Sequence, residues 1–513
     1  MVSKVLKESS SQNKEPASDR IARVRERYQK GPAFISIERA KYYTETWKET
    51  EGKNLPLSVR VALAMKNVYE KMTIYLDPDD RIAGYWTEFF LGMPIDIERG
   101  VFNQVLENEL DKTSMIYFRT RGLVKSLLYM LRKGALREFL NNQKIIRASG
   151  PIPLNLGFQT MSERKINPFQ IKEPDRLFLK RKILPFWNGK TIVDHLEKEL
   201  VKAGLYSKDM QEFIMAVPGN TSRQVLMIST SATIASFQGH IILDYEKVLK
   251  DGLLAMKARV NETLSRGQEL SEQEQNFLNS IEIALEGVMI FARRLAQRIQ
   301  EQIAHADGLK RKDELRGMLA ICQKVPFEPA ETFEQAVQSI WTVKTAVELA
   351  HPVNLHCFGR LDQTLYPYYK KDLTAGRITP EQALELLEEL LLKIMSQNLR
   401  PESNILSNFY HRYLGSSPVT LAGLKSDAED ATNELTYLFI EAVARSKAIT
   451  NIAIRVHPKT PDSVLLKIAD VLYNCTSSFA LFNDQINLSA MKRRGFAEPD
   501  ARNYAIMGCV EMT

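Results

Sequence analysis

The sequence predicts a helix-rich α/β protein, and two kinds of observation support this. Apolar residues recur at helical spacing over residues 57–72 and over a long amphipathic stretch from about Ser271 to Ala306. Two short β-like runs, ITNIAIRV at 449–456 and SFALFN at 478–483, are bounded by turn or capping residues. Helices that alternate with short buried strands are typical of an α/β layout whose ligands lie near the strand ends.

Several helix starts are marked by capping residues. A hydroxyl side chain stands three residues before a Glu or Gln at Thr332, at Thr379 (which Pro380 follows) and at Ser426, before LTYLFIEAVARS. Thr460 and Pro461 are expected to open another helix, which runs through Val471. These signals place helices on both sides of the predicted strands.

The domain organisation is weakly marked. A length of 513 residues favours two or more domains, yet no repeat or Pro/Gly-rich linker divides the chain. Residues 1–20 are rich in Ser, Lys, Glu and Gln without apolar periodicity, which predicts a disordered N-terminal tail. Residues 504–513 (YAIMGCVEMT) form an apolar run without a cap or polar tail, so we expect residues 21–513 to form a domain that is incomplete at its C-terminus.

Composition argues against several functional classes. The net charge of +7 is spread over 69 basic and 62 acidic residues, and no basic block carries interleaved aromatics, which favours a solvated surface over a nucleic-acid site. No apolar run approaches the ~20 residues that span a bilayer, and the N-terminus lacks the apolar core of a signal peptide, so we expect a cytoplasmic protein with no membrane partner. The four separated cysteines are then free thiols, each either packed in the core or reactive.

Cys509 and Glu511 are the first candidates for chemistry. In an extended segment, residues i and i+2 project to the same side, and Gly508 lets the backbone turn or approach closely. The pair suits a thiolate nucleophile with a neighbouring base, although a carboxylate raises a thiol pKa. It also suits hydrogen-atom transfer at sulfur, with Glu511 as the base. Without further context, a buried cysteine beside a structural glutamate is the commoner situation.

Histidines supply the remaining candidates. His240 follows a glycine in FQGHIILDYEKVL, and His356 stands beside Cys357 in HPVNLHCFGRLDQTLYPYY. A single histidine in an apolar setting is usually structural, but it can also hydrogen-bond a substrate hydroxyl. His351 and His356 fit neither helix face and no HExxH is present, so no metal site is expected.

Residues 451–511 contain several short strings that relate the cysteine, glutamate and histidine candidates to one another. The strings RVHPKTPDSVL, FNDQ and RRGFAEPDARNYAIMGCVE resemble the region that leads into the active-site cysteine of the glycyl radical enzymes, the pyruvate formate-lyase and glycerol dehydratase superfamily. ERAKYYTETWKETEG, PFWNGKT, GHIILDYEKVL and GRLDQTLYPYYKKD match the same family in the same order. The resemblance covers nearly all of residues 20–513.

The resemblance implies a barrel of two antiparallel five-stranded half-barrels surrounded by many helices, and a radical mechanism. A radical S-adenosylmethionine activase places a radical on a backbone glycine, which lies outside this segment, and no other cofactor is bound. The radical passes to the cysteine that matches Cys509, which abstracts a hydrogen atom from the substrate, and the glutamate that matches Glu511 deprotonates the neighbouring hydroxyl. The family's Arg-Val-x-Gly loop is absent from this chain, so the chain alone is expected to be inactive. We also expect a homodimer.

The subgroup follows from details near Cys509. Pyruvate formate-lyase (formate C-acetyltransferase) has two adjacent cysteines, whereas Cys-x-Glu resembles the branch of glycerol and propanediol dehydratases, choline trimethylamine-lyase, isethionate lyase and hydroxyproline dehydratase. His240 and His356 occupy places similar to the hydroxyl-binding histidines of glycerol dehydratase, and Cys357 stands where that enzyme has serine. A glycerol/propanediol-type dehydratase acting on a small molecule is therefore predicted. Met512 stands where the dehydratases often have proline, so the other lyases remain alternatives, as do an arylacetate decarboxylase, an alkylsuccinate synthase, a formate C-acetyltransferase-like protein and an inactive fragment or binding subunit.

Overall fold

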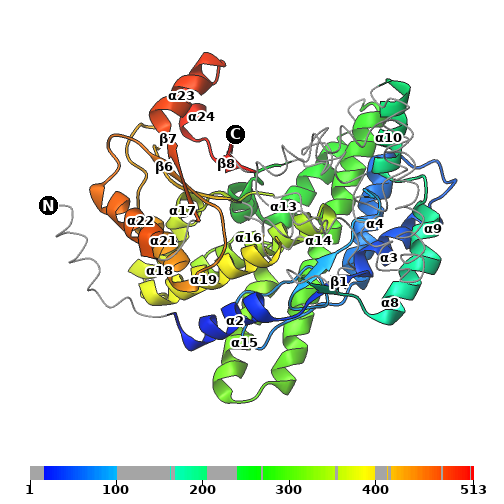
Figure 1. The fold of residues 1–513 in the computed structure, drawn as a ribbon, viewed down its shortest axis with the longest axis horizontal. Helices are drawn as coiled ribbons and strands as arrows, with labels where there is room; N and C mark the ends of the chain where they lie inside the picture. The colour runs from blue at the N-terminus through cyan, green and yellow to red at the C-terminus, as the bar shows by residue number, and fades with distance from the viewer. Residues whose placement is uncertain are drawn as a thin grey trace, which may run out of the picture.

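The computed structural model describes residues 17–100, 162, 168–204, 240–266, 270–352, 356–398, 413, 418–474, 478–508 and 510–513. In this part of the chain, helices predominate and short parallel strands lie among them, which confirms the prediction of a helix-rich α/β protein (Figure 1). None of the helices in these ranges has the length and apolar character needed to cross a membrane.

The helices surround two separate sheets. Those on the side of the first sheet in Figure 1 are α3 (Glu38–Glu49), α4 (Leu57–Lys71), α8 (Glu173–Phe178), α9 (Leu184–Trp187) and α10 (Ile192–Lys202), with a π-helical turn at Leu179–Ile183. The centre and lower part hold α2 (Asp19–Lys30), α13 (Tyr245–Ser265), α14 (Glu272–His305), α15 (Leu309–Lys324), α16 (Phe333–Ala350) and α19 (Pro380–Ser396). The remainder are α17 (Leu361–Thr364), α18 (Tyr366–Thr374), α21 (Glu434–Ser446), α22 (Asp462–Asn474), α23 (Asp484–Arg493) and α24 (Glu498–Arg502).

The helix starts agree with the capping signals, with one exception. The Thr332 and Thr379 hydroxyls accept hydrogen bonds from the Gln335 and Gln382 N–H groups, as predicted. The prediction that Ser426 caps the next helix is wrong, because α21 begins at Glu434 and is capped by Asn433. Asn433 lies directly before the helix and forms a capping box with Thr436, whereas Ser426 lies in the turn that precedes it. The long helices predicted at 57–72 and 271–306 are present as α4 and α14.

Both larger sheets are parallel. The first has the strand order β2 (Gly92–Pro94), β1 (Ala33–Ser36), β3 (Phe169–Gln170), and the second has the order β4 (Gly359–Arg360), β5 (Val419–Ala422), β6 (Ile452–Val456), β7 (Phe479–Asn483). A parallel bridge between Ile242 and Cys357 adds a fifth segment beside β4. The strands predicted at 449–456 and 478–483 are thus β6 and β7. The second half of the predicted ten-stranded barrel is not tested by the described residues and stays a prediction.

The core lies between the sheets and helices α16 and α19. These two helices bury side chains around nearly their whole circumference, including Trp341 and the run Leu390–Met395. A helix that is apolar all round belongs in the interior of a large protein. Charged side chains that occur on such helices therefore need a partner, and several of them provide the polar networks described below.

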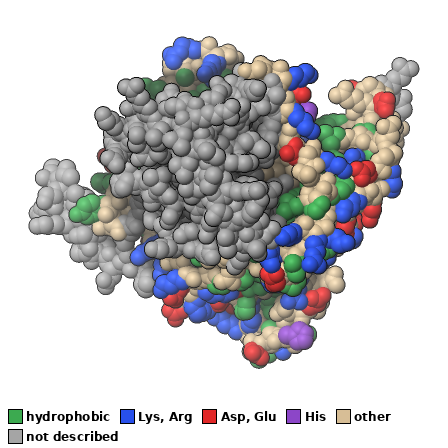
Figure 2. Space-filling view, turned by 45° about the vertical axis from the view of Figure 1, so that its right-hand side comes forward, with side chains coloured by type: hydrophobic (Ala, Val, Ile, Leu, Met, Phe, Trp, Pro, Cys, Tyr) green, Lys and Arg blue, Asp and Glu red, His purple; other side chains and the backbone are tan. Residues whose placement is uncertain are grey.

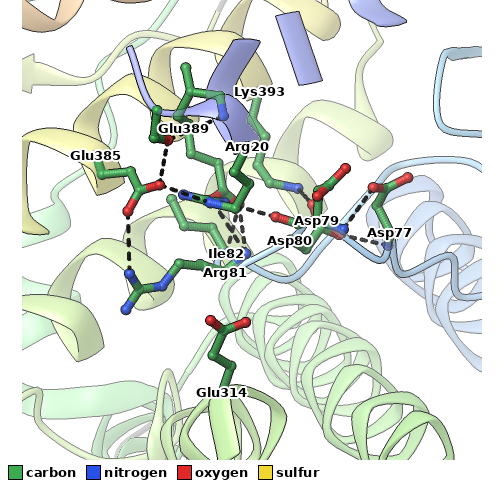
Figure 3. Close-up of polar contacts among 12 residues, drawn as sticks. Arg20, Asp77, Asp79, Asp80, Arg81, Ile82, Glu314, Glu385, Glu389 and Lys393 are labelled. Atoms are coloured by element: carbon green, nitrogen blue, oxygen red, sulfur yellow. Dashed lines mark hydrogen bonds and ion pairs between the residues drawn. The ribbon is translucent and has the colours of Figure 1, made fainter. Parts of the chain in front are cut away.

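One such network fastens the N-terminal helix to α19 (Figure 3). Helix α2 begins at Asp19, two residues inside the predicted disordered tail, because Ser18 caps it; residues 1–16 lie outside the described residues. Arg20 bonds to Glu385 and Glu389 of α19, and Lys393 of the same helix lies 2.9 Å from Asp80. Because each of these charged side chains has a partner of opposite charge, we infer that the network holds α2 and the loop around Asp80 against the core.

The surface drawn in colour in Figure 2 mixes both signs of charge. Lys and Arg side chains are interspersed with Asp and Glu over the described part of this face, and they are not gathered into one basic patch. Among the described residues, exposed charged side chains form short-range ion pairs, such as Lys30 with Glu26 and Arg266 with Glu262. Because opposite charges are interspersed, the net charge of +7 is not concentrated into a strongly basic region on the described part of this face.

Candidate active site

A β-hairpin at residues 505–513 carries the predicted cysteine–glutamate motif. Strands β8 (Ile506–Met507) and β9 (Glu511–Met512) are antiparallel, and Ala505 and Thr513 exchange two backbone hydrogen bonds at the base. Gly508 and Val510 lie in the turn that joins them, whereas Cys509 is outside the described residues. The extended segment predicted for this motif is therefore interrupted by a turn. Gly508 has φ +60°, a left-handed conformation that glycine adopts without strain.

The hairpin lies across one face of the second sheet. Tyr504 O accepts a hydrogen bond from Arg455 at the carboxyl end of β6. The Ile506 N–H donates to Thr420 Oγ1 in β5, at 2.9 Å, and the Gly508 N–H donates to Cys357 Sγ, just before β4, at 3.2 Å. These contacts lead from the carboxyl end of β6, across β5, to the residue before β4, so Gly508 does not lie at the strand ends at which ligands were expected.

Gly508 brings His240 and Glu511 together. A Cβ atom at position 508 would lie only 2.1 Å from His240 Nδ1 and 2.6 Å from Glu511 Oε2. Both side chains therefore contact the same Cα atom, and only glycine leaves them room. The Glu511 carboxylate also accepts a hydrogen bond from the Val510 N–H at 3.0 Å, so it folds back over the hairpin turn.

Cys357 lies beneath the turn. Its side chain is fully buried, its sulfur accepts the Gly508 N–H, and its own N–H donates to Ile241 O, next to His240. Burial raises the pKa of the Cys357 thiol to about 12, and the hydrogen bond from Gly508 only partly opposes this. The thiol is therefore neutral, and its contact with the hairpin backbone is a role that the predicted substrate-binding assignment did not include.

His356, beside Cys357, contacts a buried ion pair of α16. Glu348 Oε2 lies 3.0 Å from His356 Nδ1, accepts the His356 backbone N–H at 3.3 Å, and accepts a hydrogen bond from Lys344. Burial would raise the pKa of Glu348, but Lys344 and His356 hold it well below the ordinary value. Glu348 is thus a buried carboxylate anion, and the sequence analysis identified neither it nor Lys344.

The base of the hairpin rests on a second buried ion pair. Arg455 of β6 makes two hydrogen bonds to Asp484, both at 2.9 Å, and its guanidinium stacks 3.8 Å from the centre of the Tyr504 ring. The Tyr504 hydroxyl donates to the same Asp484 carboxylate at 2.7 Å. These residues were not predicted site residues, although they fall within the RVHPKTPDSVL, FNDQ and DARNY strings that carry the family resemblance.

The five predicted site residues are His240, His356, Cys357, Cys509 and Glu511, and the structure describes four of them. The structure brings together His240, Cys357 and Glu511 at Gly508, from three separate segments of the chain, and the ring of His356, the neighbour of Cys357, lies against Glu348. Cys509 lies outside the described residues, between Gly508 and Val510, which are both described. Among the described residues, no group of three or more His, Cys, Asp or Glu side chains is arranged to hold a metal ion. The arrangement offers a carboxylate, one imidazole and a neutral thiol around one hairpin turn.

Comparisons with known proteins point to one family. A sequence model described as pyruvate formate lyase-like matches residues 12–119 and 150–513. An isethionate sulfite-lyase of Nitratidesulfovibrio vulgaris is 28% identical over 505 residues, which cover 96% of this chain and 53% of that protein. A (2S)-3-sulfopropanediol dehydratase of Klebsiella oxytoca is 25% identical over 499 residues, or 96% of this chain and 52% of that protein.

A solved structure agrees with these matches. The glycerol-bound form of the B12-independent glycerol dehydratase from Clostridium butyricum superimposes with a TM-score of 0.76 at 25% identity, covering 98% of this chain and 55% of that one. The chain spans about half the length of the relatives that it matches.

Proposed function

Because this chain belongs to the pyruvate formate lyase-like family, we propose that it supplies the cysteine–glutamate half of a glycyl radical active site that breaks a carbon–heteroatom bond in a small hydroxylated substrate. The convergence of His240, Glu511 and Cys357 on Gly508, directly before Cys509, is the observation on which this proposal rests. Relatives that are named lyases and dehydratases support it.

The residues around the turn fit the presence of a radical on a neighbouring glycine. The fully buried Cys357 thiol beneath the turn is neutral, so it does not place a thiolate beside Cys509. Val510, at the tip of the hairpin, is 65% exposed, which leaves space for a second loop to approach. A glycyl radical, installed by a radical S-adenosylmethionine activase, would supply the unpaired electron to the Cys509 sulfur.

Each of the site residues in this chain then has a distinct role in the reaction. Cys509 Sγ takes a hydrogen atom from the substrate carbon that bears a hydroxyl, so that a C–H bond breaks and an S–H bond forms. The Glu511 carboxylate takes the proton of that hydroxyl. The neighbouring carbon–heteroatom bond breaks, the leaving group departs with the electron pair and receives the proton, and Cys509 returns its hydrogen atom to the product carbon. His240 and His356 hold the hydroxyl groups during these steps.

A 1,2-diol such as glycerol or propanediol is the first substrate class that we propose. His240, His356 and the Cys357 thiol would hydrogen-bond to the hydroxyl groups of the diol, and the products would be an aldehyde and water. A hydroxyalkyl sulfonate is the second candidate, because two relatives are named for isethionate and for 3-sulfopropanediol. Its cleavage would require a cation for the sulfonate group, and the described side chains found against Gly508 (His240, Glu511 and Cys357) include no arginine or lysine. Because these groups suit a hydroxyl better than a sulfonate, we place the diol first.

Anaerobic activation tests this proposal. The protein, tested with the family's glycine loop present and with the activase, should show a glycyl radical by electron paramagnetic resonance and should turn over one substrate among diols, hydroxyalkyl sulfonates, choline and hydroxyproline. Cys509→Ala and Glu511→Gln should each abolish turnover, and Glu511→Gln should keep the radical signal. The matched control is Glu498→Gln, which changes a glutamate of α24 that pairs with Lys492 and Arg502. Turnover by Cys509→Ala, or a radical without turnover of any such compound, would overturn the proposal.

The proposal also includes partners and location. We propose that the active protein is a cytoplasmic homodimer that meets its activase transiently. Analytical ultracentrifugation of the activated protein tests the dimer. If no radical forms under any condition, the alternative of an inactive binding subunit is favoured instead.

A further inference from the structure

Arg360 is a buried cation that the chemistry proposed above does not use. It is the last residue of β4 and is only 8% exposed. No carboxylate of the described residues forms an ion pair with its guanidinium, although Asp362 and Asp484 attract it from a greater distance. Burial, and after it the charge of Arg455, lowers the pKa of Arg360 to about 10, which leaves the group charged at neutral pH. Because a buried charge without an ion-pair partner is costly, this arginine calls for a reason.

The contacts of Arg360 suggest that it bridges two segments. Its Nη1 atom donates to Asn503 Oδ1 at 3.2 Å, and its Nη2 atom donates to Ala422 O at 2.9 Å. Arginine has no acceptor atom, so the amide oxygen of Asn503 must be the atom that faces it. Ala422 ends β5 with φ +58°, a left-handed conformation that strains any residue except glycine, and its N–H donates to Asp362. The guanidinium thus ties the strained end of β5 to the residue that directly precedes Tyr504 and the hairpin.

The same segment contacts the hairpin a second time. Cys357 lies just before β4, and its sulfur accepts the Gly508 N–H, whereas Arg360 ends β4 and holds Asn503. Segment 357–360 is therefore attached to segment 503–508 at both of its ends. Two attachment points oppose sliding of the hairpin along the sheet, which a single point would not do.

We propose that Arg360 is a positioning residue that fixes the hairpin along the sheet through Asn503, and thereby sets where the turn at Gly508 holds Glu511. This role rests on the function proposed above, in which Glu511 is the base.

Arg455 contacts the neighbouring residue in a different way. It donates to Tyr504 O from β6, but its charge is neutralised by Asp484. Arg360 has no such partner, so its charge strengthens the hydrogen bond to Asn503. Hydrogen bonds with one charged member are roughly twice as strong as those between neutral groups.

Hydrogen–deuterium exchange of the unactivated chain tests this role without any radical. The Ile506 and Gly508 N–H groups bond to Thr420 and to Cys357, so their exchange reports whether the hairpin stays in place. Arg360→Met should speed exchange of peptides that cover 503–508 by about 10-fold relative to peptides that cover β6. A residue with only a general structural role would speed exchange of both regions alike, since both would then open by global unfolding.

Two other variants sharpen the test. Arg445→Met is the matched control, because Arg445 of α21 pairs with the buried Glu388 of α19; it should leave the ratio of exchange rates in the two regions unchanged. Asn503→Asp keeps the proposal testable if Arg360→Met does not fold. Asn503 is exposed, so a carboxylate there stays solvated and gives Arg360 a partner of opposite charge. Asn503→Asp should therefore slow exchange of 503–508 by about 2- to 5-fold, whereas Asn503→Leu should speed it.

The outcomes separate this inference from the proposed function. Equal acceleration of the hairpin and β6 in Arg360→Met, or faster hairpin exchange in Asn503→Asp, overturns the positioning role whatever the enzyme does. In the activated protein, Arg360→Met should lower kcat about 10- to 100-fold and change KM less, because a displaced base costs more in rate than in binding. Arg445→Met should leave both constants within about 2-fold, and an unchanged kcat in Arg360→Met also overturns the role. If exchange is as expected but even the unchanged protein turns over no substrate, the proposed function fails while the positioning role of Arg360 stands.

Discussion

Replacing Gly508 by alanine tests directly whether the hairpin turn organises the site. The residue has φ +60°, a conformation that costs an L-amino acid about 1–2 kcal/mol. The new Cβ atom would also lie 2.1 Å from His240 Nδ1 and 2.6 Å from Glu511 Oε2, whereas ordinary contact begins at 3.4 Å. The ring, the carboxylate or the turn must therefore move by about 1 Å. A displacement of this size in a catalytic group costs on the order of 100-fold in rate.

Gly376 provides the matched control. It follows α18 with φ +66°, and nothing lies within 4 Å of the position that its Cβ would take. Gly376→Ala should lower the free energy of unfolding, measured with urea, by about 1–2 kcal/mol from the backbone conformation alone. Gly508→Ala should lose roughly a further 1–3 kcal/mol through overpacking, and in the activated protein it alone should reduce kcat. Equal losses of stability and unchanged turnover in the two variants would refute the reasoning that His240 and Glu511 meet over Gly508.

Three further predictions concern buried polar groups. Arg455→Met or Asp484→Asn should each lower the free energy of unfolding by about 3–5 kcal/mol, because each leaves an unpaired buried charge. In a double-mutant cycle measured with urea, the double variant should lose less stability than the two single variants added together. Additive losses would contradict an interaction between Arg455 and Asp484. Burial raises the pKa of Glu88 to about 7 from 4.5, so the folded state binds this proton more tightly than the unfolded state does. Protonation of Glu88 therefore contributes at most about 3 kcal/mol to the free energy of unfolding; this contribution is complete below about pH 4.5 and is lost as the pH rises through 7. Glu88→Gln should remove that part of the pH dependence of stability. An unchanged pH profile in this variant would contradict the assignment to Glu88. The Tyr245 hydroxyl is buried without a hydrogen-bond partner among the described residues, so Tyr245→Phe should leave the unfolding free energy unchanged or raise it by up to about 1 kcal/mol, whereas Tyr69→Phe, which removes a bond to Ala346 O, should lower it.

Local signals in the sequence predicted helices α4, α14, α16, α19, α21 and α22 and the two longest strands of the second sheet. A helix start depends on a few neighbouring residues, which is why Thr332 and Thr379 could be recognised as caps. The error at Ser426 has the same origin, since a capping pattern can occur by chance in a turn and Asn433 lies closer to the apolar helix. Strand pairing could not be predicted in this way, because the bridge between Ile242 and Cys357 joins segments more than 100 residues apart.

The candidate site was only partly predictable for the same reason. His240, His356 and Glu511 could be connected only through the family resemblance, because no local spacing relates them. Lys344 and Glu348, in contrast, left a signal that was not used. They are the only charged residues between positions 335 and 350 of α16, and a pair of opposite charges at i and i+4 in a helix that is otherwise uncharged over this span indicates a buried ion pair.

The strings that identify this family are separate in sequence but form one contact in space. Arg455 belongs to the first string, Asp484 to the second and Tyr504 to the third. Beneath the hairpin base, the Asp484 carboxylate accepts from Arg455 and from the Tyr504 hydroxyl, and Arg455 also donates to Tyr504 O. The same hairpin ends at Gly508, where any side chain would strike His240 and Glu511. A fixed base and a turn without a side chain together determine where the residue after Gly508 is presented. A change in any one of these strings should therefore move the turn relative to the histidine and the carboxylate that surround it.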